Sequence, residues 1–231
     1  MTGETMSTVL ITGGNRGIGL ELARQYSAEG WTVLATARQP EQAEALATLG
    51  AQVSIVPLEA SDGASIQALA ANLRGVPIDV LIANAGISGD LKAAAQAVSR
   101  DDFLNVMAVN VIGPLLLARA LKPNVLLGQR RVVAAMSSLM SSISANDWGT
   151  QYAYRASKTA LNAIWRTLAR EWGADGLCCV LLRPGLVATD MTGGAGQPVQ
   201  ASVAGMRQVI EGLSLKDRGR LIGFDGQDVP W

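Results

Sequence analysis

"TVLITGGNRGIG", residues 8–19, joins a short apolar run to a turn that contains four glycines. Beyond this turn, Leu22 and Tyr26 follow Ile18 at helical spacing, and Gly30 is a suitable helix stop. The stretch therefore predicts a buried strand, a glycine turn and a helix, in that order.

The same alternation continues along the chain. Further apolar runs predict strands at residues 31–37, 51–58, 78–86, 130–138 and 176–185. The segments between them predict helices at residues 40–49, 63–73, 99–123 and 152–173. The apolar runs are continuous rather than alternating, which is typical of strands buried on both faces of a parallel sheet. We therefore expect residues 1–231 to form a single-domain α/β fold, a Rossmann-type doubly wound parallel β-sheet with helices on both faces.

Two segments predict less regular structure. Residues 188–203, "ATDMTGGAGQPVQASV", are rich in glycine and small side chains, which predicts a mobile loop that leads into a short helix. Residues 1–6 are expected to be a flexible N-terminus. In a doubly wound sheet the ligand binds at the carboxyl ends of the strands, so the functional site is expected there.

The chain of 231 residues contains no histidine, and 19 basic residues balance 19 acidic ones. Without histidine the usual general base, the Ser/His/Asp triad and most zinc chemistry are excluded, so no metal site is predicted. No charge block favours binding to nucleic acid or to a membrane surface. A small molecule is the expected partner.

The two cysteines are adjacent, at Cys178 and Cys179, and are unsuited to pair with each other. They are expected to be small buried side chains of a strand, in a reducing compartment. The apolar runs are broken before the roughly 18 residues that a membrane helix needs, and the start "MTGETMST" has no secretion signal. The protein is expected to be cytoplasmic.

The glycine turn has a chemical interpretation. Gly13, Gly17 and Gly19 let the backbone turn tightly and approach a pyrophosphate, and the following helix presents free N–H groups and its positive dipole end. A glycine motif alone is weak, but its position between a first strand and a first helix is the required context. The spacing TGxxxGIG differs from GxGxxG.

Further motifs follow along the chain. "NAG" at 84–86 comes after a predicted strand, Asn110 lies in a predicted helix, and Tyr154 and Lys158 form the motif YxxxK. With the glycine turn, Ser138 and "RPGLVAT", the pattern resembles the short-chain dehydrogenase/reductase family over nearly the whole chain. It is most similar to the C-factor-like and carbonyl-reductase-like branch, notably in "YAYRASK" and the closing "FDGQDVPW".

The chemistry explains the motif YxxxK. A tyrosine with a pKa of about 10 is a poor base at neutral pH, so it needs a nearby positive charge that favours the phenolate. Tyr154 and Lys158 share a helix face, whereas Tyr152 is rotated by roughly 200° about the axis. Tyr154 is therefore the predicted acid/base.

The resemblance implies a role for each catalytic candidate. Tyr154 would exchange a proton with the substrate oxygen, and Lys158 would also bind the nicotinamide ribose. Ser138 would hydrogen-bond the same oxygen, and Asn110 would hold a water that links Lys158 to solvent. The serine assignment stays open, because neighbouring serines are available. In addition, Ser138 and Tyr154 are separated by more residues than is usual in the family. An insertion at residues 144–149 would account for the extra length. The alternatives are Ser137, Ser141 and Ser142.

Two arginines suggest the cofactor. The second strand ends "ATAR", without the carboxylate that binds the ribose 2′-OH of NAD, and Arg38 with Arg16 could clamp a 2′-phosphate. NADP(H) is therefore predicted over NAD(H). Glu59 stands where the family often has an aspartate beside the adenine. The predicted cofactor-binding residues are Gly13, Asn15, Arg16, Gly17, Ile18, Gly19, Arg38, Glu59, Ala60, Asn84, Ala85, Gly86, Tyr154, Lys158, Pro184, Gly185, Val187 and Thr189.

The predicted function is hydride transfer between nicotinamide and a carbonyl or alcohol substrate. The alternative is a C-factor-like signalling or interaction protein with secondary or vestigial dehydrogenase activity. Trp165 and Trp172 are expected at a subunit interface of a homo-oligomer, a dimer or a tetramer. A further set of side chains either lines an apolar substrate pocket or belongs to the core. These are Leu139, Met140, Ile143, Trp148, Tyr152 and Met191.

Overall fold

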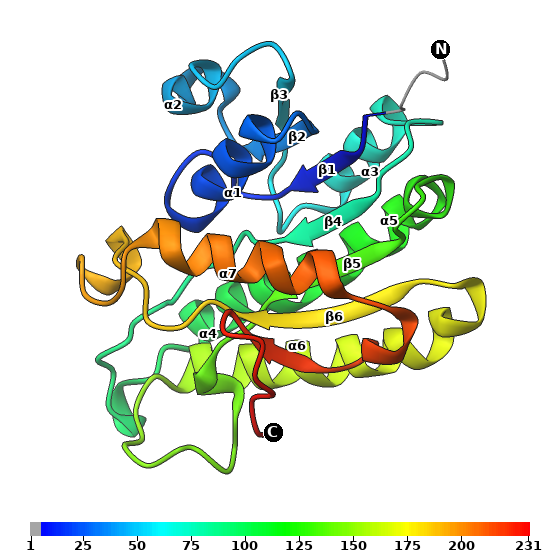
Figure 1. Ribbon diagram of the computed structural model, residues 1–231. Helices are drawn as coiled ribbons and strands as arrows, with labels where there is room; N and C mark the ends of the chain where they lie inside the picture. Colours follow the sequence, from blue (N-terminus) through cyan, green and yellow to red (C-terminus); the bar gives the residue numbers. More distant parts are fainter. Residues whose placement is uncertain (1–5) are drawn as a thin grey trace, which may run out of the picture.

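A computed structural model of the chain describes residues 6–231 (Figure 1). The predicted flexible segment 1–6 therefore falls almost entirely outside the described residues. Seven parallel strands form one sheet in the order β3-β2-β1-β4-β5-β6-β7. The order reverses between β1 and β4, which opens a crevice at the carboxyl ends of these two strands. The predicted doubly wound parallel sheet is confirmed.

The strands and helices follow the predicted alternation. The strands are β1 (Thr8–Ile11), β2 (Thr32–Ala37), β3 (Val53–Pro57), β4 (Val80–Ala83), β5 (Val132–Met136), β6 (Cys178–Arg183) and β7 (Leu221–Gly223). The helices are α1 (Gly17–Ala28), α2 (Glu44–Ala47), α3 (Gly63–Asn72), α4 (Arg100–Met107), α5 (Gly113–Leu127), α6 (Tyr152–Glu171) and α7 (Val199–Gly212).

Helices cover both faces of the sheet (Figure 1). Each face has its own hydrophobic layer. Leu10, Leu81 and Val133 pack with buried residues of α3, α5 and α6. Their neighbours Val9 and Ile82 point to the other face and pack with α1, α2 and α7. Because successive strand residues point to opposite faces, helices on both sides require continuous apolar strands.

The predicted helix 99–123 is divided in two. The π-helical segment Ala108–Ile112 separates α4 from α5, although the helical run 100–127 is continuous. By length and composition this run could span a membrane, because an 18-residue window has a mean hydropathy of 1.7. Half of that window is buried inside the fold. Its apolar character is thus explained by packing between the sheet and the neighbouring helices.

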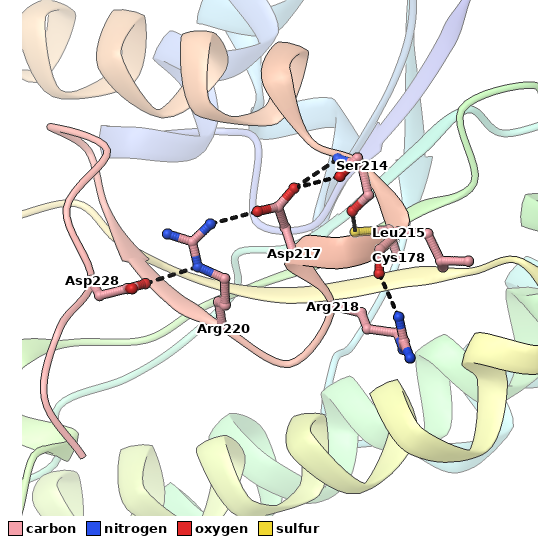
Figure 2. A network of polar contacts seen from close by, with 7 residues as sticks. All are labelled: Cys178, Ser214, Leu215, Asp217, Arg218, Arg220 and Asp228. Atoms are coloured by element: carbon pink, nitrogen blue, oxygen red, sulfur yellow. Dashed lines mark hydrogen bonds and ion pairs between the residues drawn. The ribbon is translucent and has the colours of Figure 1, made fainter.

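Two elements differ from the prediction. The helix predicted at 40–49 is a 3₁₀ turn, Pro40–Gln42, followed by the single turn of α2. The edge strand β7 was not predicted, because a strand of three residues carries almost no sequence pattern. A polar network supports this edge: Arg220 bonds both Asp217 and Asp228, and Asp228 lies in the closing segment that pairs back onto β7 (Figure 2).

The prediction of an interface role for two tryptophans is wrong. Trp165 is fully buried in the core, and its Nε1 donates to the carbonyl oxygen of Val133 at 3.1 Å. Trp172 is also buried, and the ammonium of Lys122 lies 5.0 Å from its ring centroid. Both side chains fill the space between α6 and the sheet, which explains the apolar character of this helix.

The segment predicted as a mobile loop, residues 188–203, is held by hydrogen bonds. Thr189 and Thr192 form a reciprocal capping box, and Gln197 pairs with Val187 in an isolated bridge. The helix that follows, α7, has 14 residues and covers the sheet, so it is longer than expected. This segment therefore forms a defined wall beside the carboxyl ends of the strands.

Candidate active site

The glycine turn forms an anion cradle between β1 and α1. Gly13 and Gly17 have positive φ angles of 64° and 54°, in the region that favours glycine. A Cβ on Gly19 would lie 2.1 Å from the carbonyl oxygen of Gly13, so only glycine lets the helix approach the turn. The N-cap residue, Arg16, makes no side-chain capping bond, and the first turn holds no acidic residue. The positive end of α1 is thus available to an anion.

The NAG motif fastens the ends of β1 and β4 together. The hydroxyl of Thr12 accepts hydrogen bonds from the N–H groups of Asn84 at 3.0 Å and Ala85 at 2.9 Å. The side-chain amide of Asn84 donates to the carbonyl oxygen of Thr12 at 2.9 Å. A Cβ on Gly13 would lie 3.2 Å from Cα of Ala85. These contacts hold the crevice at the topological switch point in one geometry.

The end of β2 lies beside the glycine turn. Gly14 N–H donates to the carbonyl oxygen of Thr36 at 2.8 Å, and the exposed Arg38 follows two residues later. Arg16 is also exposed and bonds Asp190 at 3.4 Å, so a phosphate would compete with that carboxylate for its guanidinium. Asn15 is exposed at the tip of the turn.

The predicted adenine contacts lie after β3. The backbone of this strand is joined to β2, because Leu58 N–H donates to the carbonyl oxygen of Ala37 at 3.0 Å. The carboxylate of Glu59 accepts a hydrogen bond from the Ser61 hydroxyl at 2.9 Å. Ala60 follows, and its carbonyl oxygen occupies the place that a Cβ on Gly113 would need. The structure thus brings Glu59 and Ala60 to the same sheet edge as Arg38.

The segment after β6 faces the glycine turn. The carbonyl oxygen of Pro184 accepts hydrogen bonds from Gln197 at 3.0 Å and Ser202 at 2.7 Å, and Gly185 has a φ of 82°. A Cβ on Gly17 would lie 3.5 Å from the methyl group of Thr189. The predicted contacts of residues 184–189 therefore lie across the crevice from the anion cradle.

Lys158 is buried beside Tyr154. Its Nζ donates to the carbonyl oxygen of Met136, at the end of β5, at 2.8 Å. The same atom lies 5.7 Å from the ring centroid of Tyr154. Burial lowers the pKa of Lys158 to about 8, because a desolvated ammonium is unfavourable.

Tyr154 differs from the expectation in the sign of its pKa shift. Burial raises the pKa of Tyr154, and a hydrogen bond to the Ser138 side chain only partly opposes this. The sequence suggested a lowered pKa caused by Lys158. The buried ammonium is bonded to the carbonyl of Met136 and lies over the ring, so desolvation of the phenol dominates. Tyr154 is therefore held in its protonated form.

The structure separates the four candidate serines. Of the four, only Ser138 lies near enough to Tyr154 to lower the pKa of its phenol, and the Ser138 hydroxyl accepts a hydrogen bond from the N–H of Met140 at 3.1 Å. The other three hydroxyls have partners elsewhere. Ser137 bonds Asn162, Ser141 donates to the carbonyl oxygen of Ser138, and Ser142 donates to the carbonyl oxygen of Trp231. The geometry therefore favours Ser138 as the serine of the site.

Asn110 is fully buried in the π-helical segment between α4 and α5. Its side chain accepts from the N–H of Ile87 at 2.9 Å and donates to the carbonyl oxygen of Ile87 at 2.8 Å. It also donates to the hydroxyl of Ser157 at 3.0 Å. A Cβ on Gly86 would lie 3.2 Å from Asn110 Oδ1 and 3.5 Å from Lys158 Nζ. Asn110 and Lys158 thus approach each other across the NAG motif.

Four of the proposed pocket side chains are not core residues. Ile143, Trp148, Tyr152 and Met191 are 76%, 50%, 45% and 44% exposed, respectively. Leu139 instead packs against the core beside α6. These exposed apolar side chains lie on the loop before α6, at the first residue of α6 and in the segment after β6.

Sequence reasoning missed several residues that position the site. Thr12 supports the NAG motif, and Met136 supplies the carbonyl that binds Lys158. Ser157 links Asn110 to α6. Its hydroxyl accepts a hydrogen bond from the side-chain amide of Asn110 and donates one to the carbonyl oxygen of Tyr154 at 2.7 Å. The position of Ser157 within "YRASK" was a usable signal, whereas a backbone carbonyl leaves no signal in a sequence.

A dinucleotide suits these residues. The uncapped helix N-terminus and the glycines of the turn leave room and donors for a pyrophosphate. Arg38 and Arg16 supply positive charge at one end of the crevice. Tyr154, Ser138 and Lys158 supply hydroxyl and ammonium groups at the other end.

The comparisons with known proteins agree with this geometry. A family model described as short chain dehydrogenase matches residues 7–200. The C-signal of Myxococcus xanthus is 42% identical over 167 residues, which are 72% of this chain and all of that protein.

Solved structures match over nearly the whole chain. The NADPH-bound carbonyl reductase from chicken fatty liver has a TM-score of 0.91 and 34% identity, covering 98% of this chain and 99% of its own. The carbonyl reductase Sniffer of D. melanogaster has a TM-score of 0.91 and 31% identity, covering 98% of this chain and all of its own. The chain therefore belongs to the short-chain dehydrogenase/reductase family of oxidoreductases.

Proposed function

We propose that the protein is an NADP(H)-dependent oxidoreductase that transfers a hydride between nicotinamide and a carbonyl or alcohol substrate. The observation that carries the proposal is the grouping of Tyr154, Ser138 and Lys158 at the carboxyl end of β5, across the crevice from the anion cradle. The cofactor, when bound, supplies or accepts the hydride. The residues of this chain orient the substrate and handle the proton.

Tyr154 is the proposed proton donor to the carbonyl oxygen. Because burial raises its pKa, the phenol is protonated at neutral pH, which is the form that reduction needs. Ser138 donates a second hydrogen bond to the same oxygen as negative charge develops there. The two hydroxyls together fix the oxygen, and the apolar surface around Trp148 and Tyr152 would receive the body of the substrate.

Lys158 and Asn110 are proposed to return a proton to Tyr154. With a pKa lowered to about 8, Lys158 can exchange a proton near neutral pH. Asn110 and Lys158 flank Gly86, which would let a water bridge them and connect the ammonium to solvent.

The proposed preference for NADP(H) rests on Arg38 and Arg16. Both are exposed beside the glycine turn, and the end of β2 carries an arginine in place of the carboxylate that would bind a free ribose 2′-OH. The related carbonyl reductase from chicken fatty liver was solved with NADPH bound, which supports the same choice.

The test follows NADPH absorbance at 340 nm across a panel of aldehydes, ketones and quinones, with NADH in parallel. We expect turnover of at least one carbonyl class and a higher kcat/KM for NADPH than for NADH. Tight NADPH binding, measured by fluorescence, without turnover of any panel member would overturn the enzymatic proposal.

A second candidate is a cofactor-binding signalling or interaction protein. It is favoured by the 42% identity to the C-signal of Myxococcus xanthus. The presence of Tyr154, Lys158, Ser138 and Asn110 together argues against a vestigial site, because loss of any one would suffice to disable it. We further propose a cytoplasmic location and a homo-oligomeric state. Light scattering during size-exclusion chromatography would test the oligomeric state.

A further inference from the structure

Arg155, the residue after the catalytic tyrosine, is a buried guanidinium without a partner. It is 8% exposed, and its Nε, Nη1 and Nη2 atoms make no hydrogen bond in the structure. Residues 6–231 contain eight buried side-chain nitrogen or oxygen atoms without a partner, and four belong to Arg155 and Gln151. One turn at the start of α6 thus holds half of the unsatisfied groups.

A buried ion without a partner is unfavourable, since it loses its water and gains no compensating charge. The indole of Trp148 covers the face of the guanidinium, whose carbon lies 4.4 Å from the ring centroid. Stacking leaves the in-plane N–H donors unused. None of the ion pairs formed within residues 6–231 involves Arg155. The donors are therefore unpartnered, although almost none of their surface is exposed in this structure.

The N-terminus of α6 adds further donors at the same place. The N-cap, Gln151, has a φ of 58° and makes no side-chain capping bond, and the first turn holds no acidic residue. The first N–H groups of this 20-residue helix are therefore without side-chain acceptors. Helical side chains lean toward the helix N-terminus, so the side chain of Arg155 extends over this first turn.

We propose that Arg155 and the N-terminus of α6 bind a carboxylate of the substrate, and that Trp148 covers it. The site deepens the proposed function, on which it rests, by naming the substrate class as carbonyl compounds that carry a carboxylate. Arg155 is adjacent in sequence to Tyr154, and neighbouring Cα atoms are about 3.8 Å apart. Because successive residues of a helix point about 100° apart, the two side chains diverge, and a substrate that contacts both has to span the distance between their ends. Trp148 lies on the loop that joins Ser138 to α6 and is half exposed, so it is accessible to an incoming ligand.

The main test compares two aldehydes that differ in charge, 4-carboxybenzaldehyde and its methyl ester, with NADPH. The wild type is expected to favour the carboxylate, and Arg155→Met should reduce the ratio of the two kcat/KM values by roughly 10- to 100-fold, the range for hydrogen bonds to a charged group. Arg155→Lys should retain part of the ratio, because a lysine keeps the charge and loses the bidentate geometry. The control Arg170→Met removes an exposed arginine of the same helix and should change neither value.

A second measurement does not depend on turnover. Benzoate should raise the melting temperature of the wild type and not that of Arg155→Met. If no aldehyde is reduced while benzoate still stabilises through Arg155, the proposed function fails and the carboxylate site stands. An equal loss on both aldehydes, or equal stabilisation of both proteins by benzoate, would show that Arg155 has a structural role only. A fall in oligomeric mass in Arg155→Met with an unchanged aldehyde ratio would assign the guanidinium to a second copy of the chain, and would likewise overturn the proposal.

Discussion

Replacing Lys158 with methionine is expected to stabilise the folded protein at pH 7. Burial lowers the pKa of Lys158 from 10.5 to about 8, which corresponds to about 3 kcal/mol of unfavourable burial when the side chain is charged. Methionine keeps the apolar stem and removes the charge. It also leaves the carbonyl of Met136 without its partner, which costs about 1 to 2 kcal/mol. The expected net gain at pH 7 is therefore about 1 to 2 kcal/mol.

The sign of the effect should depend on pH. Below pH 8 Lys158 is charged in both the folded and the unfolded states, so the wild type carries the full penalty. Between pH 8 and 10.5 the folded state is neutral while the unfolded state still binds a proton, and the wild type gains stability. The advantage of Lys158→Met should consequently shrink above pH 8 and be reversed by pH 10.

Urea unfolding at pH 7 and pH 10, without cofactor, measures this difference, because cofactor binding would add its own stabilisation. Titration of Tyr26, whose pKa is raised to about 12, affects both proteins alike and cancels. Lys92→Met, at an exposed lysine, is the control and should show no such pH dependence. A Lys158→Met protein that is less stable than the wild type by the same amount at both pH values would refute the reasoning.

Two further changes test the cofactor site. Arg38→Asp should weaken NADPH binding by roughly 10- to 100-fold, through the loss of a charge-assisted hydrogen bond, while NADH binding changes little. Fluorescence titration of both cofactors measures this difference. An equal effect on the two cofactors would contradict the proposed binding of the 2′-phosphate by Arg38. Gly19→Ala should destabilise the fold by about 1 to 3 kcal/mol or more, because the new Cβ would meet the carbonyl oxygen of Gly13 at 2.1 Å. Urea unfolding measures this loss of stability, with Gly63→Ala as the control, because a Cβ at Gly63 would meet no neighbouring atom. Equal stability of the two variants would contradict this account.

The fold was predictable where periodicity and motif spacing agree. The alternation of apolar runs and helices predicted six of the seven strands and the doubly wound parallel sheet that they form. The exception, β7, is three residues long and depends on its neighbour β6 for pairing. Trp165 was misassigned because a sequence shows that a helix face is apolar without showing whether the sheet or a second subunit covers it.

The sequence predicted which residues form the candidate site, but it did not predict their pKa shifts. The motif YxxxK located Tyr154 and Lys158, since helical spacing alone aligns them. The raised pKa of Tyr154 depends on how many neighbours exclude water, and the bond from Lys158 ends on a backbone carbonyl. Arg155 escaped notice because an arginine in a helix is usually solvated, and only the packing of Trp148 over it shows that it is buried.

The most direct test of the account is the turnover of Tyr154→Phe with NADPH and a carbonyl substrate that the wild type reduces. Loss of the proton donor should lower kcat by roughly 10²- to 10⁴-fold, while NADPH affinity stays largely intact because the glycine turn and Arg38 are untouched. Turnover of Tyr154→Phe comparable to that of the wild type would contradict the assignment of Tyr154 as the acid/base.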